Sequence, residues 1–242
     1  MSTLTRIIVS SIISLFMLSC NFSMNFGPGI DGSKNVVSAD RNISTDFNAV
    51  KVSQGLNLYI TQSKNVSLSI EADDNLHDII VTKVENGTLS IYTTENIRRA
   101  SSKNILLSVP NLNTIKATSG SNVYATSAID LNKLELTTTS GANIKLDIKT
   151  QNLICRSTSG SNIILNGTTK NMTAEATSGS NIRASNLSAE TSNVKATSGA
   201  NVTINTLKEL TARATSGGNV RYSGNPESIN KSDSSAGSIR AQ

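Results

Sequence analysis

Aromatic residues, histidine and cysteine are scarce in this 242-residue chain. It has no Trp, four Phe, four Tyr, one His and two Cys. A core with so few rings must be filled by Ile, Leu, Val and Ala, which suits a thin structure with little interior volume. A single His gives no basis for a Ser-His-Asp arrangement. Only Cys155 would remain beside an N-terminal Cys20, so a framework of disulfides is excluded.

The N-terminus has the form of an export signal. A basic residue is followed by an apolar run over residues 7–18 and then by Ser19 and Cys20. This order predicts a secretory signal peptide over residues 1–19, too short to span a bilayer as a mature helix. Residues 15–20 (LFMLSC) resemble a bacterial lipobox, which implies that Cys20 becomes the lipidated first residue of the mature protein. The alternative is an ordinary signal peptide that happens to end in Cys.

The mature chain is expected to divide into a tether and one folded domain. Residues 20–40, with Cys20 at their start, are polar and turn-rich and predict a flexible tether. Residues 41–242 predict a single domain, in which no run is long and apolar enough to cross a membrane. Alternating apolar and polar residues predict irregular β-strands over residues 41–111. Regular repeats are predicted over residues 112–242.

The regular part is written around a five-residue phrase, Thr-Ser-Gly-x-Asn, which occurs six times. Successive phrases are 21, 19, 19, 20 and 18 residues apart, and a weaker copy containing Gly237 follows 20 residues after the last. A period near 20 with polar turn residues at the constant positions is typical of a solenoid. The expected structural turn residues are Gly120, Gly141, Gly160, Gly179, Gly199 and Gly217, with Asn122, Asn143, Asn162, Asn181, Asn201 and Asn219.

Apolar residues stand at alternate positions on both sides of each phrase, as Leu134 and Leu136 do before the second phrase and Ile144 and Leu146 after it. This predicts a strand that enters the phrase and a strand that leaves it, each with one face toward the core. The phrase is then a corner, where Gly allows a positive φ. Stacked rungs would align the Asn side chains into a ladder. We expect the ladder to stabilise the turns, and a saccharide-binding surface is the alternative.

The fold class is therefore all-β. The spacing predicts a parallel β-helix, or β-solenoid, with rungs of about 20 residues after an irregular N-terminal part.

The order of the motifs resembles a known family. Phe-x-x-Val-x-Val-x-x-Gly-Leu-x-Leu-x-Ile at residues 47–60 is followed by Asn-Gly-Thr-Leu-Ser-Ile at residues 86–91, by Pro-x-Leu at residues 110–112 and then by the repeated phrases. This order is similar to that of the head GIN domain family, described as putative auto-transporter adhesins. The resemblance covers residues 46–240. It implies a β-helix-like fold, export and an adhesin-like role, and it transfers no binding residues.

Basic side chains recur at outward positions beside the phrase. Residues 116–242 contain 13 Lys and Arg against 8 Asp and Glu, whereas residues 1–115 contain nine of each. The excess predicts a surface for an anionic glycan, lipopolysaccharide or phospholipid, and a solvated strand face is the alternative. Nucleic acid is not expected, because the chain is exported and base-stacking aromatics are scarce. The candidate residues are Lys116, Arg156, Lys195 and Arg213 before the phrase, and Arg183 and Arg221 after it.

Acidic residues give little support for catalysis. Those in the repeats fall at inconsistent rung positions, and none form the carboxylate pair of a glycosidase. Asp73, Asp74 and Asp78 lie near His77, where a metal site competes with a solvated acidic turn, and we expect the turn. The sequence thus favours a non-enzymatic binding or structural module with no cofactor or metal. A carbohydrate-active β-helix enzyme, a polysaccharide lyase or hydrolase, is the alternative.

The expected location is the cell envelope. A lipid on Cys20 would anchor the chain in the outer membrane, on either the periplasmic or the surface side. The expected partners are that membrane and an anionic glycan, lipopolysaccharide or another envelope protein. A purely architectural or regulatory lipoprotein without a ligand is a further alternative.

The lipobox interpretation predicts the behaviour of Cys20→Ala. We expect radioactive palmitate to label the wild-type protein and not the variant, because the substitution removes the acceptor thiol. Gel autoradiography of expressing cells checks this, and persistent labelling of Cys20→Ala would contradict the lipobox.

Overall fold

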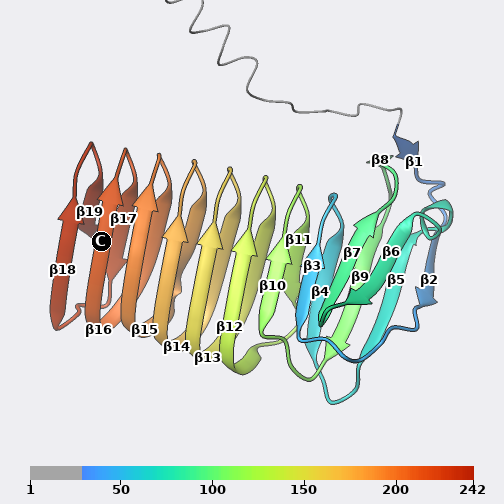
Figure 1. The fold of residues 1–242 in the computed structure, drawn as a ribbon, viewed down its shortest axis with the longest axis horizontal. Coiled ribbons are helices and arrows are strands. Elements are labelled where there is room, and N and C mark those ends of the chain that lie inside the picture. The colour runs from blue at the N-terminus through green and yellow to red at the C-terminus, as the bar shows by residue number, and fades with distance from the viewer. Residues whose placement is uncertain (1–28) are drawn as a thin grey trace, which may run out of the picture.

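The computed structural model describes residues 29–242, so the predicted signal peptide and Cys20 lie outside it. It confirms the predicted β-solenoid, in which strands stack along one long axis (Figure 1). The N-terminal elements are β1 (Ile30–Asp31), β2 (Val36–Asp40), β3 (Ala49–Val52), β4 (Asn57–Gln62), β5 (Ser67–Asp73), the 3-10 turn η1 (Asp74–Leu76), β6 (Ile80–Glu85), β7 (Thr88–Thr93), β8 (Ile97–Arg99) and β9 (Lys103–Val109). The regular strands are β10 (Thr114–Ala117), β11 (Asn122–Ala125), β12 (Ile129–Thr138), β13 (Asn143–Ser157), β14 (Asn162–Ala176), β15 (Asn181–Thr197), β16 (Asn201–Thr215), β17 (Asn219–Ser223), β18 (Ser228–Asp233) and β19 (Ser238–Ala241).

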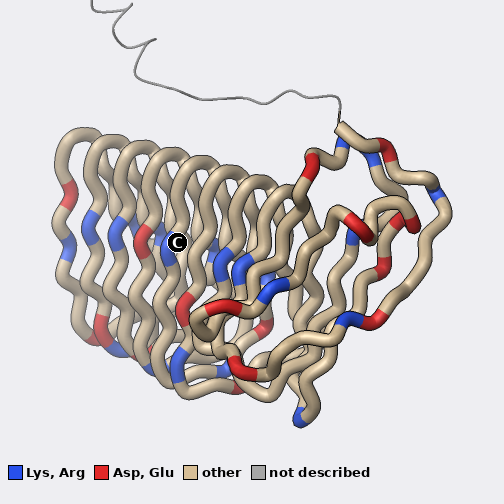
Figure 2. Tube along the Cα trace, turned by 45° about the vertical axis from the view of Figure 1, so that its right-hand side comes forward, with Lys and Arg blue, Asp and Glu red and all other residues tan. Residues whose placement is uncertain are grey.

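Adjacent rungs are joined by parallel ladders of hydrogen bonds. Along β13 and β14, Asn143 lies beside Asn162 and Ser157 lies beside Ala176, a register of 19 residues. The first half of each long strand leaves one corner, and its second half enters the next. We call the outward surface of the leaving halves the exit face and that of the entering halves the entry face. The corners form the upper edge of the solenoid in Figure 1, and Figure 2 shows the stacked turns from another side.

The solenoid begins before the first repeated phrase. β3 and β4 enter and leave a corner at residues 53–57, and they pair in parallel with β10 and β11. In this corner Gln54 and Gly55 have φ of 57° and 70°. A complete corner therefore lies inside residues 41–111, and only part of that segment is irregular.

Antiparallel strands close the N-terminal end. β6 pairs with β7, and β5 pairs with both β9 and β2. β1 and β2 lie in the segment for which the sequence predicts a flexible tether, so residues 30–40 differ from that prediction. The physical reason is the open edge of β5, whose backbone donors and acceptors are paired by β2.

Each phrase forms a corner with two consecutive residues at positive φ. In the third phrase φ is 54° at Ser159 and 69° at Gly160, and the Ser161 N–H donates to the Thr158 carbonyl at 3.3 Å. This is a type I′ turn. The sequence predicts a positive φ for Gly alone, whereas the preceding Ser adopts it in all six phrases. The Gly160 N–H donates to the carbonyl of Ser178 in the next corner at 3.1 Å, so the ladder continues through the turn.

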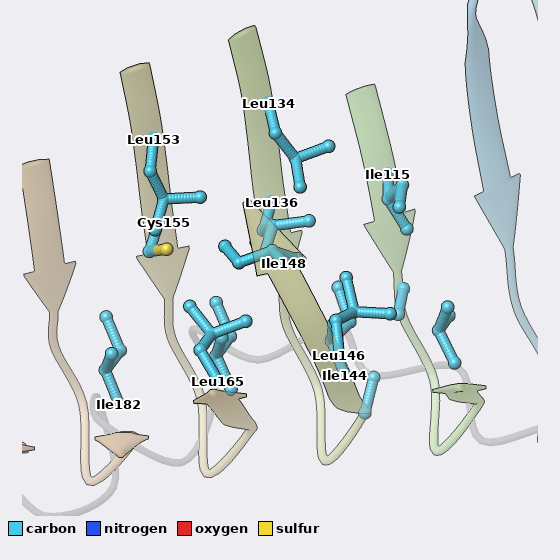
Figure 3. Packing of buried hydrophobic residues seen from close by; sticks show 14 of the residues in the cluster. Ile115, Leu134, Leu136, Ile144, Leu146, Ile148, Leu153, Cys155, Leu165 and Ile182 are labelled. Atoms are coloured by element: carbon cyan, nitrogen blue, oxygen red, sulfur yellow. The ribbon is translucent and has the colours of Figure 1, made fainter. Parts of the chain in front are cut away.

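The core is a narrow aliphatic layer between entering and leaving strands. Leu153 and Cys155 project inward from β13, next to Leu134 and Leu136 from the preceding rung (Figure 3). All four are buried, which confirms the inward face that alternation predicts. Burial raises the pKa of the Cys155 thiol, so this residue serves as a small apolar side chain.

The last rung carries charged residues at inward positions. In β18, Lys231 lies beside Ala212 and Asp233 lies beside Ala214. The Lys231 Nζ donates to the Tyr222 hydroxyl at 2.6 Å. Inward charge on a terminal strand discourages a further strand from continuing the sheet. The charges of β18 therefore oppose pairing of a further strand with this rung.

In the weak copy of the phrase, the glycine does not occupy the corner position that Gly has in the six regular phrases. Ser235 and Ala236 have φ of 51° and 62°, so Ala236 takes the place of the corner glycine. Gly237 occupies the following position, where a Cβ would lie 2.2 Å from the Ala214 carbonyl oxygen. Close approach of the backbone, and not a positive φ, explains this glycine.

The corner geometry predicts the effect of Gly160→Val. A Cβ at Gly160 would meet no atom within 4 Å, so any loss of stability comes from the backbone alone. A residue other than Gly at positive φ costs roughly 1–2 kcal/mol, and a β-branched side chain is at the upper end. We expect the melting temperature to fall by about 2–4 °C for each kcal/mol, as measured by thermal unfolding. Gly160→Asn is the matched control, because Asn tolerates this conformation, and an unchanged Gly160→Val would refute the corner geometry.

Candidate binding surface

An unbroken ladder of Asn side chains lines the exit face beside the corners. Each amide Nδ2 donates to the Oδ1 of the preceding rung, at distances from 2.8 to 3.3 Å. At its N-terminal end, Asn104 Nδ2 donates to Glu71 Oε1 at 3.1 Å. The ladder consists of Asn104, Asn57, Asn122, Asn143, Asn162, Asn181, Asn201 and Asn219. Bonds that all point one way reinforce one another, and the Glu71 carboxylate accepts the last donor.

The repeated phrase does not predict two members of this ladder, Asn57 and Asn104. Asn57 follows Gly55 in the order Gly-Leu-Asn-Leu, which repeats the Gly-x-Asn-apolar order of the phrases. That order was the available signal. Asn104 follows no comparable glycine, and only the pairing of β4 with β9 places it in line.

The predicted basic residues occupy two different faces. The entry face carries Lys116, Arg156, Lys195 and Arg213. In Figure 2, blue basic segments follow one another on adjacent turns, with a red acidic segment among them. Arg183 and Arg221 lie on the exit face. Because the chain reverses at the corner, the outward sides of the entering and leaving strands face in different directions. The six residues therefore form two rows and not one surface.

Acidic neighbours neutralise part of the entry-face row. Arg156 Nη1 lies 2.6 Å from Glu135 Oε1, and its Nε lies 3.7 Å from Glu175 Oε2. A groove of about 450 Å³ runs between this row and the corner threonines. Its lining includes Thr137, Arg156, Glu175, Lys195, Thr158, Thr177 and Thr197. Within the described chain, Arg156 is paired and Lys195 is not, so the positive charge of this groove is partly offset.

A second hollow, on the exit face, keeps its positive charge. Its volume is about 250 Å³. Arg183, Thr203 and Arg221 line it from three successive rungs, with Thr203 in the middle. Neither arginine forms an ion pair with any residue of the described chain. The ladder residues Asn181, Asn201 and Asn219 also line the hollow. Two guanidinium groups with amide and hydroxyl neighbours supply the donors that a carboxylate, sulfate or phosphate group needs.

The acidic turn near His77 is a structural junction. Asp73 is fully buried, and its carboxylate accepts hydrogen bonds from the backbone N–H groups of Lys34, Ser101 and Ser102, each at 3.0 Å. Burial alone would raise the pKa of Asp73, but these donors outweigh it and hold the pKa below its usual value. The sequence predicts a solvated turn here, and the fully buried Asp73 differs from that prediction.

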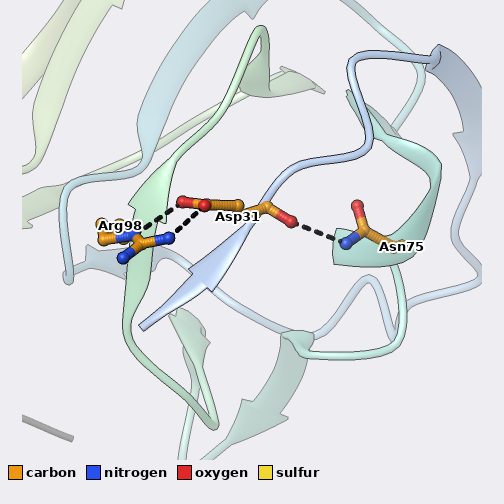
Figure 4. A network of polar contacts seen from close by, with 3 residues as sticks. All are labelled: Asp31, Asn75 and Arg98. Atoms are coloured by element: carbon orange, nitrogen blue, oxygen red, sulfur yellow. Dashed lines mark hydrogen bonds and ion pairs between the residues drawn. The ribbon is translucent and has the colours of Figure 1, made fainter. Parts of the chain in front are cut away.

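A neighbouring set of polar contacts fastens the first strand. The Arg98 Nε donates to Asp31 Oδ1 at 2.8 Å, and the Asn75 Nδ2 donates to the Asp31 carbonyl at 2.9 Å (Figure 4). These contacts tie β1 to β8 and to η1. The acidic residues of this region therefore hold loops together.

Neither a metal-binding cluster nor a membrane-spanning helix is found within residues 29–242. No three His, Cys, Asp or Glu side chains of this range gather as metal ligands would. No helix of this range has the length and apolar character needed to cross a bilayer.

Stacked rungs with long outward rows of polar side chains define a β-solenoid that presents extended flat faces to its surroundings. A family model described as putative auto-transporter adhesin, head GIN domain, matches residues 46–226. The chain belongs to this family, as its motifs indicate.

Solved structures share the fold. A putative adhesin from Bacteroides fragilis has a TM-score of 0.81 at 23% identity, over 88% of this chain and 100% of that one. A putative lipid binding protein from Parabacteroides distasonis has a TM-score of 0.71 at 23% identity, over 88% and 99%. A putative adhesin from Parabacteroides merdae has a TM-score of 0.72 at 17% identity, over 88% and 98%. No curated protein matches the chain in sequence.

The burial of Asp73 predicts an acid-sensitive junction. Because its pKa is lowered in the folded state, the charged carboxylate stabilises the fold above its unfolded pKa, and this contribution is lost as pH falls below about 4. We expect Asp73→Asn to reduce the free energy of unfolding by about 1–3 kcal/mol at pH 7, with a smaller difference from wild type at pH 3. Urea unfolding at both pH values measures this. Exposed Asp233→Asn is the control, and an equal deficit at both pH values would contradict the role of the charge.

Proposed function

We propose that the protein is an exported, non-enzymatic binding module of the adhesin type, held at the cell envelope by a lipid on Cys20. Its ligand is an anionic glycan or the anionic part of lipopolysaccharide, bound on the exit face. Membership of an adhesin-type family supports a binding role. The lipobox supports attachment to the outer membrane through Cys20.

The observation that carries this proposal is the hollow with Arg183 and Arg221. Arg156 on the entry face already has two acidic partners, whereas these two arginines have none within the described chain. Arg183 and Arg221 lie one rung before and one rung after Thr203, so their backbone positions are about 10 Å apart along the axis. That spacing suits acidic groups repeated along an extended chain.

The enzyme alternative finds no specific support in the geometry. Of the acidic residues in the repeats, Asp130, Glu135 and Glu190 form ion pairs with Lys149, Arg156 and Lys208. The hydrogen bond from Lys208 holds the pKa of the Glu190 carboxyl below its ordinary value, which makes Glu190 a poor general acid.

The proposal predicts that Arg183→Ser with Arg221→Ser weakens binding to lipopolysaccharide and to acidic polysaccharides. We expect about a tenfold or greater loss in affinity, because two charge-assisted contacts are removed. Surface plasmon resonance against immobilised ligands at several salt concentrations measures this, and the salt dependence should decrease with the lost charges.

The matched control is Arg156→Ser with Arg213→Ser, which removes the same charge from the entry face. We expect its affinity to stay within about twofold of wild type. Equal losses in both double variants would show that only net charge matters. Absence of binding to every acidic ligand in an array would overturn the proposal.

A further inference from the structure

One outward row of the exit face changes character where the N-terminal strands meet the repeats. This row consists of the residues two positions after each ladder Asn, and we call it the central row. Along the regular rungs it holds Lys145, Ile164, Arg183, Thr203 and Arg221. On β11 and β4 the same row holds Tyr124 and Tyr59, and Leu106 on β9 continues it.

The two tyrosines stack on each other at the surface. Their ring centroids are 5.3 Å apart with an angle of 28° between the planes, and both side chains are half-buried. Leu106 beside them is 40% exposed. A cross-strand aromatic pair stabilises a sheet, but that role does not require an outward position next to an exposed Leu. Because the two rings stack on each other, their faces are directed toward the neighbouring rungs, and with Leu106 they form an apolar strip in a polar face.

Polar groups with unused hydrogen-bonding capacity border this strip on both sides. Asn57 and Asn122 precede the tyrosines by two residues, and each donates one N–H and accepts one hydrogen bond along the ladder. An amide offers two donors and two lone pairs, so one of each remains for a ligand. Thr61 and Thr126 follow the tyrosines by two residues, with their Oγ1 atoms 2.7 Å apart.

We propose that Tyr59, Tyr124 and Leu106 form an apolar platform on which the pyranose rings of a saccharide pack. One face of a pyranose ring is apolar C–H surface, and its rim carries hydroxyl groups that both donate and accept. An aromatic strip between amide and hydroxyl rows matches that distribution, because apolar contact comes from the rings and orientation comes from a few polar groups. The site takes neutral sugar units and does not depend on charge.

The platform also deepens the proposed function and in that respect rests on it. Tyr124 and Arg183 are three rungs apart on the central row, about 14 Å along the axis. A single extended saccharide then stacks at one end of the exit face and presents its acidic groups to the arginines at the other.

The test uses neutral oligosaccharides, which separates the platform from the arginine hollow. The probes are the hexasaccharides of cellulose, chitin, xylan and β-mannan, titrated into the mature protein. Because the chain has no Trp, its intrinsic fluorescence comes from four tyrosines, two of which form the platform. We expect at least one probe to change the tyrosine fluorescence, and saturation-transfer NMR to show contact with ring C–H protons.

Variants decide whether the tyrosines carry this binding. Tyr59→Ala with Tyr124→Ala should weaken it by about tenfold or more, whereas Tyr59→Phe with Tyr124→Phe should retain it, because the rings remain. Ile154→Ala is the matched control, because Ile154 is an outward apolar residue on the entry face, and it should leave binding unchanged. Circular dichroism and melting temperatures verify that each variant is folded.

Two results would overturn the platform. One is that none of the four hexasaccharides binds at millimolar concentration. The other is unchanged affinity in the folded alanine double variant. Arg183→Ser with Arg221→Ser should not affect the binding of neutral probes. If acidic ligands fail to bind while neutral saccharides bind, the proposed function fails and the platform stands. If neutral saccharides fail to bind while acidic ligands bind, the platform alone fails.

Discussion

The structure depends on one backbone constraint, a corner in which two successive residues have positive φ. Ser159 and Gly160 reverse the chain within a single turn, and the Gly160 N–H is then free to bond the next corner. Because every corner has the same shape, each following Asn lies beside the Asn of the neighbouring rung. The amide ladder, the parallel register and the outward rows of both faces all follow from this repeated turn.

The same repetition makes departures from the pattern informative. Regular corners and ladder amides are required by the stack, so they distinguish no site by themselves. The outward positions carry no such requirement, and there the two faces differ. Acidic residues compensate Arg156 on the entry face, whereas the exit face combines uncompensated arginines with a pair of stacked tyrosines. This difference between the faces is what supports the proposed binding role of the exit face.

Both ends of the solenoid show how a repeated sheet is stopped. At the N-terminal end, antiparallel strands and the buried Asp73 close the stack and provide Glu71, which accepts the last donor of the ladder. At the C-terminal end, Lys231 and Asp233 occupy inward positions that hold uncharged residues in the earlier regular rungs. These ends limit the length of the exit face, and the aromatic strip lies at the junction with the first of them.

The sequence by itself determined the fold class, the corners at the six repeated phrases and the inward face of the strands beside them. These are local properties, since a period near 20 and alternation within a few residues are readable along the chain. It also indicated the basic residues, but it could not separate Arg156 from Arg183 by face or show which has an acidic partner. Tyr59 and Tyr124 are 65 residues apart, as are Asn57 and Asn122, and an irregular excursion lies between them. Only the tertiary structure decided those pairs, because parallel pairing of β4 with β11 depends on how the chain returns from that excursion.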